Sequence, residues 1–335
     1  MAAQFEVAEL TTGQSEVWDR LLSGSPQATI FCSPQFSRAL AEATGQAYRF
    51  VVCFREDRLI AGIPLFEWRR AGILMVRQPP LVPHLGLIVS GDVEADHPRS
   101  REFNVLQACR ALSEWLAERY DYVSFSHHPS LTDVRPFLWQ GFREKACYTY
   151  RIRLARFGPD MLHSSTRNKI AKARREHVQI EESEDLTHIL VMVEMSYARR
   201  GRKVPFSKRY LETLFRCLAR HGLVRLHYAR NSEGKVVSGR IILESFDVVY
   251  DWVAGADPVH YGSAATPFLL YTIIEKSRKG HDIYDLMGAN TPSIAAFKSN
   301  FGGEIAPYYL TSKTVSIKGS LALFSREILK RWRRM

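Results

Sequence analysis

The chain has 335 residues, of which 46% are hydrophobic and 24% charged. These values are typical of globular proteins and exclude disordered, collagen-like and coiled-coil chains. The length predicts two domains. No stretch reaches the roughly 18 uncharged apolar residues of a membrane span. The formal charge of +11 indicates an anionic partner.

The N-terminal segment, residues 1–10, has two glutamates and no apolar core of a signal peptide, so we expect a cytoplasmic protein. The five cysteines are widely spaced, without a C-x-x-C pair or a zinc-like spacing. This pattern is typical of buried thiols in a reducing compartment, and we expect no metal site.

An internal repeat organises the chain. Residues 50–66 and residues 224–243 each read as strand, polar turn and strand, with Gly62 and Gly239 at the same place in the second strand. Each copy continues with further strands, an amphipathic helix, a short strand, a second helix, an aromatic–glycine pair and a last strand. The long helices are predicted over 102–119 and 265–279, and the short strands over 120–125 and 281–286.

Matched features in the same order predict an α/β fold with two domains of similar topology, each a mixed sheet flanked by helices. The predicted boundaries are 1–156 and 157–318, followed by a basic C-terminal helix over 319–335. The composition of this last segment is that of an interfacial helix, which would give peripheral contact with anionic lipid at the inner face of the membrane. Packing of its apolar side on its own domain is the alternative.

Positive charge is concentrated in three segments. Residues 151–175 carry eight Lys or Arg against one acid, 199–209 carry six and no acid, and 326–335 carry five against one. Like charges packed together repel each other unless a partner neutralises them. The pattern therefore favours an anionic small-molecule or lipid-linked substrate, with an ordinary solvated surface as the alternative.

The second copy contains several motifs in a defined order. They are the helix Arg167-x-Lys169-Ile-x-Lys172-Ala-x-Arg175, Gly255 before a loop over 261–267, Tyr284-Asp285-x-x-Gly288, and Phe297-Lys298-x-x-Phe301-Gly302. Their order and spacing resemble the FemAB-like branch of the GNAT acyltransferase superfamily, in which two GNAT-like domains lie in tandem. The resemblance is most specific to its acetyltransferase-like domain, found in polysaccharide and envelope systems.

The resemblance implies an enzyme that transfers an acyl or aminoacyl group to an amine. We expect an N-acyltransferase that uses acyl-CoA, with acetyl-CoA the first choice, as a co-substrate and not as a permanently bound cofactor. Its acceptor would be an amine of a cell-envelope or polysaccharide precursor. Two alternatives stay open: a Fem-type enzyme whose donor is aminoacyl-tRNA, and a non-enzymatic protein that binds nucleic acid or another anionic surface.

The donor site is expected at the start of the helix after residue 260. Small residues there allow close approach of the backbone, Thr266 can cap the helix, and Pro267 suits its first turn. Free N–H groups at such a start bind phosphate, whereas an ordinary capped helix is the alternative. The candidate cofactor-binding residues are Gly262, Ser263, Ala265 and Thr266.

Amide formation needs a proton acceptor and groups that stabilise the developing oxyanion. Asp251, Asp285 and Glu275 are the candidate acceptors near predicted strand ends, with His260 as a further choice. Asp285 could instead cap the following turn. Lys298 is the candidate to hold a substrate phosphate or stabilise the carbonyl oxygen, with a solvated lysine between two aromatics as the alternative. The predicted catalytic residues are Asp251, Asp285 and Lys298.

Basic and aromatic residues near these motifs are the candidates for substrate binding. Arginine forks recognise phosphate groups, and aromatic rings can line an acyl channel, although surface exposure and core packing would explain the same residues. The candidates are Arg167, Lys169, Lys172, Tyr197, Arg200 and Tyr250.

Overall fold

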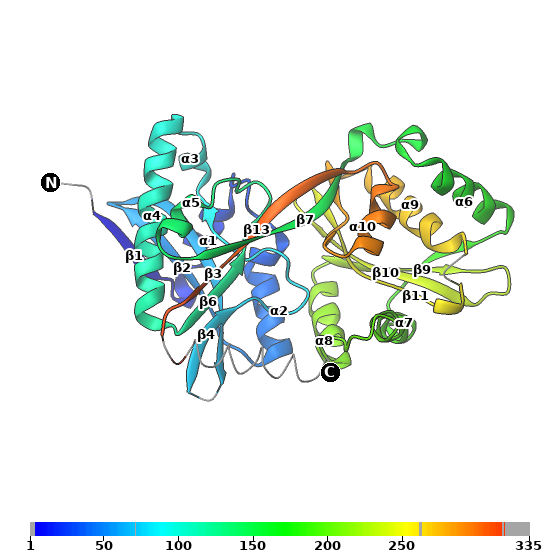
Figure 1. Ribbon diagram of the computed structural model, residues 1–335, viewed down its shortest axis with the longest axis horizontal. Coiled ribbons are helices and arrows are strands. Elements are labelled where there is room, and N and C mark those ends of the chain that lie inside the picture. The colour runs from blue at the N-terminus through cyan, green and yellow to red at the C-terminus, as the bar shows by residue number, and fades with distance from the viewer. Residues whose placement is uncertain (1–3, 71, 261–262, 317, 319–335) are drawn as a thin grey trace. The chain divides into compact units, whose positions relative to one another are not determined.

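The computed structural model describes residues 4–70, 72–260, 263–316 and 318 (Figure 1). The chain divides into two compact units, Met1–Ala146 with Tyr308–Met335, and Cys147–Pro307. The predicted domains, 1–156 and 157–318, are contiguous stretches defined by the repeat, and their boundaries stay a prediction. The predicted basic helix over 319–335 lies outside the described residues.

The first unit is built on a six-stranded sheet in the order β1-β2-β3-β4-β6-β13, and β5 pairs with β3. Its neighbouring strands are antiparallel except for the parallel pair β4–β6. The elements are β1 (Phe5–Glu9), α1 (Ser15–Leu22), α2 (Pro34–Thr44), β2 (Tyr48–Arg55), β3 (Arg58–Arg70), β4 (Ile73–Arg77), β5 (Ile88–Val89), α3 (Gly91–Glu94), α4 (Pro98–Arg119), β6 (Tyr122–Ser126), α5 (Arg135–Trp139) and β13 (Glu304–Thr314).

The second unit has a sheet of the same size in the order β7-β12-β11-β10-β9-β8. Here β11 and β12 form the parallel pair and the other neighbours are antiparallel. The elements are β7 (Arg143–Arg153), α6 (Ser164–Arg175), β8 (Gln179–Ser183), α7 (Thr187–Ala198), α8 (Lys208–Ala219), β9 (Val224–Arg230), β10 (Val236–Ser245), β11 (Val248–Ala256), α9 (Ala265–Ser277), β12 (Ile283–Asp285) and α10 (Pro292–Ser299). Short 3₁₀ helices are η1 (Thr12–Gln14), η2 (Ile30–Cys32), η3 (Leu154–Arg156), η4 (Pro159–Met161) and η5 (Pro258–His260).

The two sheets exchange their last strands. β7 is the last strand of the first repeat, yet it pairs with β12 of the second repeat. β13 is the last strand of the second repeat, and it pairs with β6 of the first. Each sheet is therefore completed by the other copy, and neither repeat forms its whole sheet alone.

The repeated glycines allow a helix to approach the sheet closely. A Cβ atom on Gly62 would lie 2.6 Å from a Leu21 methyl group of α1, and one on Gly239 would lie 3.0 Å from the Ile189 Cδ1 of α7. On the opposite face of each sheet, α4 and α9 bury most of the remaining core. The predicted α/β fold with mixed sheets is thus confirmed, and so is each paired helix and short strand of the repeat.

The described part of the chain has no helix with both the length and the apolar character that crossing a bilayer requires.

Candidate active site

The parallel strands β11 and β12 separate at one point of the second sheet. They pair at Val248 with Ile283, at Val249 with Tyr284 and at Tyr250 with Asp285. β12 ends there, whereas β11 continues to Ala256 and leads into α9. The carboxyl ends of parallel strands, where a helix follows, are the usual ligand-binding position in α/β proteins.

A buried ion pair lies beside this point. The Arg240 guanidinium, in the middle of β10, donates to Asp251 Oδ2 on β11, and the two side chains are 4% and 1% exposed. Tyr284 is fully buried nearby, and burial raises its pKa well above the usual value. Among the described residues, Asp251 Oδ1, Arg240 Nε and the Tyr284 hydroxyl have no hydrogen-bond partner. Unused bonding capacity of buried polar groups indicates a place where a ligand can bind.

Asp285 ends β12 and is completely buried. Its Oδ1 accepts hydrogen bonds from Thr149 Oγ1 at 2.5 Å and from the Met287 N–H at 2.8 Å. Its Oδ2 lies 3.6 Å from Arg151 Nε, which is an ion-pair distance and too long for a hydrogen bond. Burial raises the pKa of Asp285, although the Thr149 hydrogen bond and the Arg151 charge oppose that effect. A carboxylate with a raised pKa, and with one oxygen that has no hydrogen-bond partner among the described residues, is suited to accept a proton.

Lys298 organises the loop that follows Asp285. From α10 its ammonium donates to the carbonyl oxygens of Leu286, Met287 and Gly288, at 2.5, 3.0 and 3.1 Å. Met287 has a left-handed backbone with a φ of 60°, and this turns successive carbonyls toward one point. Burial lowers the pKa of Lys298 to about 8, while Asp251 and Asp285 act to raise it. All three ammonium protons are therefore used by the loop.

The equivalent point of the first unit is filled by its own side chains. There β4 and β6 are parallel over three pairs, and Gln78 accepts from the Ser126 N–H at 3.0 Å. His127, completely buried, lies 2.9 Å from Thr311 Oγ1 and accepts from the Leu87 N–H at 3.2 Å. Burial lowers the pKa of His127 to about 3, so the imidazole is neutral at neutral pH. Gln78 and His127 thus have hydrogen-bond partners. Asp251 and Asp285 of the second unit, in contrast, each have one oxygen without a hydrogen-bond partner among the described residues.

The start of α9 lies in the connection after β11. Thr266, predicted as the N-cap, is instead the second helical residue, and Ala264 is the N-cap without a side-chain hydrogen bond. Ser263 Oγ is buried and has no partner among the described residues. Ala265 begins the helix, and Gly262 lies outside the described residues. Within the part of the chain that the structure describes, no side chain caps this helix, so backbone N–H groups of its first turn can bind a ligand.

The predicted basic helix is α6, which contacts α9. Arg167 donates to the carbonyl oxygens of Leu162 at 2.5 Å and Pro159 at 3.5 Å, so its guanidinium is directed at the backbone. Lys172 lies 3.5 Å from Glu176 in an exposed ion pair. Lys169 is exposed.

The remaining candidates divide between two places. Tyr250 is buried on β11 directly before Asp251, so their side chains leave opposite faces of the strand. Tyr197 and Arg200 lie at the C-terminal end of α7, with the guanidinium 5.3 Å from the ring centre and hydrogen-bonded to the Ser196 carbonyl at 2.8 Å. The structure thus brings Asp251, Asp285 and Lys298 together and places Tyr197 and Arg200 elsewhere.

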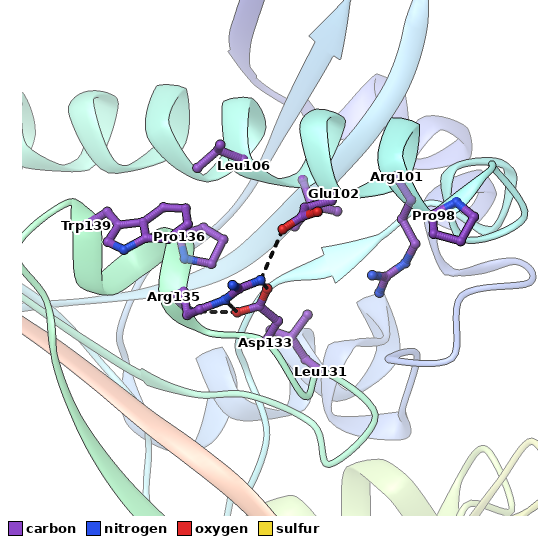
Figure 2. Close-up of a pocket in the computed structure, with 10 residues that line it drawn as sticks. Pro98, Arg101, Glu102, Leu106, Leu131, Asp133, Arg135, Pro136 and Trp139 are labelled. Carbon is purple, nitrogen blue, oxygen red and sulfur yellow. Dashed lines mark hydrogen bonds and ion pairs between the residues drawn. The ribbon is translucent and has the colours of Figure 1, made fainter.

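A pocket of about 250 Å³ lies in the first unit between α4 and α5 (Figure 2). Its charged side chains neutralise one another: Arg135 lies 2.7 Å from Asp133 and 3.1 Å from Glu102, and Arg101 lies 2.6 Å from Glu94. No candidate from the sequence lines it. Each charged side chain that lines this pocket therefore has an ion-pair partner.

Sequence reasoning missed Arg240 and Arg151. Arg240 had a usable signal, because an arginine inside the apolar strand Val236-Val-Ser-Gly-Arg240-Ile-Ile-Leu243 needs a buried partner. Arg151 had none, because its partner Asp285 is brought to it only by the pairing of β7 with β12.

Residues 163–299 match the family model described as acetyltransferase (GNAT) domain. The match lies within the second unit and includes Asp251, Asp285 and Lys298. A search of curated proteins finds no significant match.

Similar solved structures extend over both units. A crystal structure of FemX has a TM-score of 0.64 at 12% identity, covering 91% of this chain and 96% of that chain. A tandem GNAT protein from the clavulanic acid biosynthesis pathway has a TM-score of 0.58 at 10% identity, covering 93% and 99%. The C-terminal domain of a putative lysylphosphatidylglycerol synthetase from Agrobacterium fabrum has a TM-score of 0.54 at 14% identity, covering 94% and 97%. At these identities the likeness establishes a two-domain fold of the same kind.

Proposed function

We propose that this chain transfers an acyl group from acyl-CoA to an amine. The premise is that residues 163–299 are an acetyltransferase domain of the GNAT family and that the chain is an acyltransferase. The observation that carries the proposal is the separation of β11 and β12 beside two buried carboxylates. Each of them has one oxygen without a hydrogen-bond partner among the described residues. The first unit has the same strand pair but fills it with satisfied side chains. We therefore assign the chemistry to the second unit.

The reaction joins the acceptor nitrogen to the thioester carbonyl carbon. The new C–N bond forms as the C–S bond breaks, the amine proton passes to Asp285, and CoA leaves as the thiolate. Asp285 suits this role because its pKa is raised by burial and its Oδ2 has no hydrogen-bond partner among the described residues. Lys298 acts as a positioning residue, since its hydrogen bonds hold the loop that follows Asp285.

The donor would bind between the end of the β11–β12 pair and the start of α9. Past Tyr250 the edge of β11 is no longer paired with β12, so an extended pantetheine arm can lie along it. The CoA phosphates would then meet Ser263, Ala265 and Thr266 at the start of α9, where no described side chain caps the helix.

A charge at position 266 tests this donor site. We expect Thr266→Glu to raise the Kd for acetyl-CoA at least about tenfold, because a carboxylate would repel the phosphates while suiting the helix dipole. The neutral Thr266→Gln, of nearly the same size, is the matched control and should change the Kd by less than about threefold. Calorimetric titration of both variants measures the difference, and equal affinities would contradict the donor site.

The acceptor is proposed to be an amine of a cell-envelope or polysaccharide precursor. The motif resemblance supports this class, and so does the similarity to a domain of a putative lysylphosphatidylglycerol synthetase. A Fem-type use of aminoacyl-tRNA is the second candidate, favoured by the basic face of α6 and by the FemX-like fold. Thermal unfolding distinguishes them, since acetyl-CoA at 100 times its Kd stabilises by about 2.7 kcal/mol and a tRNA-dependent enzyme would show no such shift.

A further inference from the structure

Helix α7 has an apolar side that faces away from its own sheet. The helix packs on β10 and β11 (Figure 1). Ile189, Met192 and Val193 are buried, and Gly255 lets the helix approach closely, since a Cβ atom there would lie 2.8 Å from Met192 Cβ. Its sequence, Thr187-His-Ile-Leu-Val-Met-Val-Glu-Met-Ser-Tyr-Ala198, is mostly apolar and contains one carboxylate, Glu194. A helix of this composition is normally buried on all sides.

The outward side of α7 is nevertheless exposed. Val191 and Met195, four residues apart and hence on one face, are 40% and 43% exposed, and Ala198 continues this row. Val259 in η5, which contacts α7, is 83% exposed. We call Val191, Met195, Ala198 and Val259 the α7 patch. Clustered exposed apolar side chains mark an interaction surface more often than scattered ones do.

Positive charge adjoins the α7 patch. Residues 199–209, the segment that follows α7, contain six Lys or Arg and no acid, and Arg202 and Lys203 are exposed. Acidic side chains beside the patch have lysine partners: Glu194 lies 3.4 Å from Lys208, and Asp257 lies 3.0 Å from Lys235. The surface therefore combines exposed apolar side chains with an excess of positive charge.

From this combination we propose that the α7 patch and residues 199–209 dock the protein on an anionic lipid bilayer. Apolar side chains enter the boundary between headgroups and acyl chains, while lysine and arginine pair with anionic headgroups. A nucleic acid would use the positive charge but would leave Val191, Met195 and Val259 in water. The residues of this surface differ from those proposed to bind the donor, which are Ser263, Ala265 and Thr266.

Flotation with lipid vesicles tests the proposal on the full chain. We expect binding to phosphatidylcholine vesicles that contain roughly one third phosphatidylglycerol, and much weaker binding to pure phosphatidylcholine. Combining Val191→Ser, Met195→Ser and Val259→Ser should lower the partition coefficient at least about tenfold. The matched control is Phe246→Ser, because Phe246 is 60% exposed on the turn between β10 and β11 and lies outside the patch.

A second pair of variants tests the charges. Arg202→Glu with Lys203→Glu should also lower the partition coefficient at least about tenfold. Arg143→Glu with Lys145→Glu, which are also exposed and lie on β7, should change it less than about threefold.

A variant of the C-terminal segment and a measurement of RNA binding test whether another surface or a nucleic acid accounts for the result. Replacing Lys330, Arg331, Arg333 and Arg334 by Ala should leave most of the vesicle binding. The proposal is overturned if the wild-type protein does not bind anionic vesicles, if only the C-terminal variant loses binding, or if the charge variant loses RNA binding while it keeps vesicle binding. Unchanged melting temperatures would establish that each variant is folded.

Discussion

Arg240→Met is expected to lower the free energy of unfolding by about 3–5 kcal/mol, because it leaves the Asp251 carboxylate buried without its partner. The two side chains are 4% and 1% exposed, so water cannot replace the lost interaction. Methionine keeps much of the arginine's length and its contact with Phe297, and therefore isolates the loss of charge. Urea unfolding of the purified variant measures the change.

Two controls identify the cause of that loss. Combining Arg240→Met with Asp251→Leu should recover stability to within about 2 kcal/mol of the wild type, because no unpaired charge remains buried. Arg225→Met, on the neighbouring strand β9, removes exposed ion pairs with Glu182 and Glu244 and should cost less than about 1 kcal/mol. If Arg240→Met and Arg225→Met are equally mild, the buried pair does not stabilise the fold as described.

Asp285→Asn is expected to lower kcat at least about 100-fold, because the amide cannot accept the amine proton. Asn keeps the size of the side chain, and its oxygen can still accept from Thr149 and the Met287 N–H. The control is Asp282→Asn, three residues earlier and exposed, which should change kcat by less than about twofold. A thiol assay for released CoA, with the acceptor at saturation, measures both variants.

The dependence on pH separates a proton acceptor from a merely structural residue. Burial raises the pKa of Asp285 in the folded protein above its pKa in the unfolded chain. At a pH between these two pKa values the folded protein binds more protons than the unfolded chain. The free energy of unfolding therefore falls as the pH rises through this range, and the ionised carboxylate lowers stability at higher pH. At pH 7, Asp285→Asn should therefore unfold with an equal or higher free energy. The wild-type rate should rise as the pH increases through the raised pKa of Asp285. The rate of the Asp285→Asn variant should not show this rise. A variant that loses activity only by unfolding would contradict the role.

Local sequence signals predicted much of the fold. The hairpins, the paired helices and the positions of Gly62 and Gly239 follow from alternation, turn residues and the repeat, all of which are local properties. The exchange of β7 and β13 could not be read in this way. Consecutive elements usually lie next to each other, and the alternation of a strand does not specify which sheet edge it joins.

The candidate site was predicted only in part. The motif order pointed to Asp285 and Lys298, but the ammonium's three carbonyl partners depend on the left-handed backbone of Met287, which no residue pattern indicated. Arg240 carried a signal of its own as a charge inside an apolar strand. Arg151 lies beside Asp285 only because β7 pairs with β12, so this contact could not be predicted from the local sequence.

Hydrogen–deuterium exchange with and without saturating acetyl-CoA tests the assignment of donor binding to the second unit most directly. Ligand contact slows exchange of the amides that it orders or covers. We expect protection in residues 265–270 at the start of α9 and in 283–290 around Asp285, with residues 122–134 of the first unit unchanged. Protection confined to the first unit, or none in a protein that binds acetyl-CoA, would contradict the account.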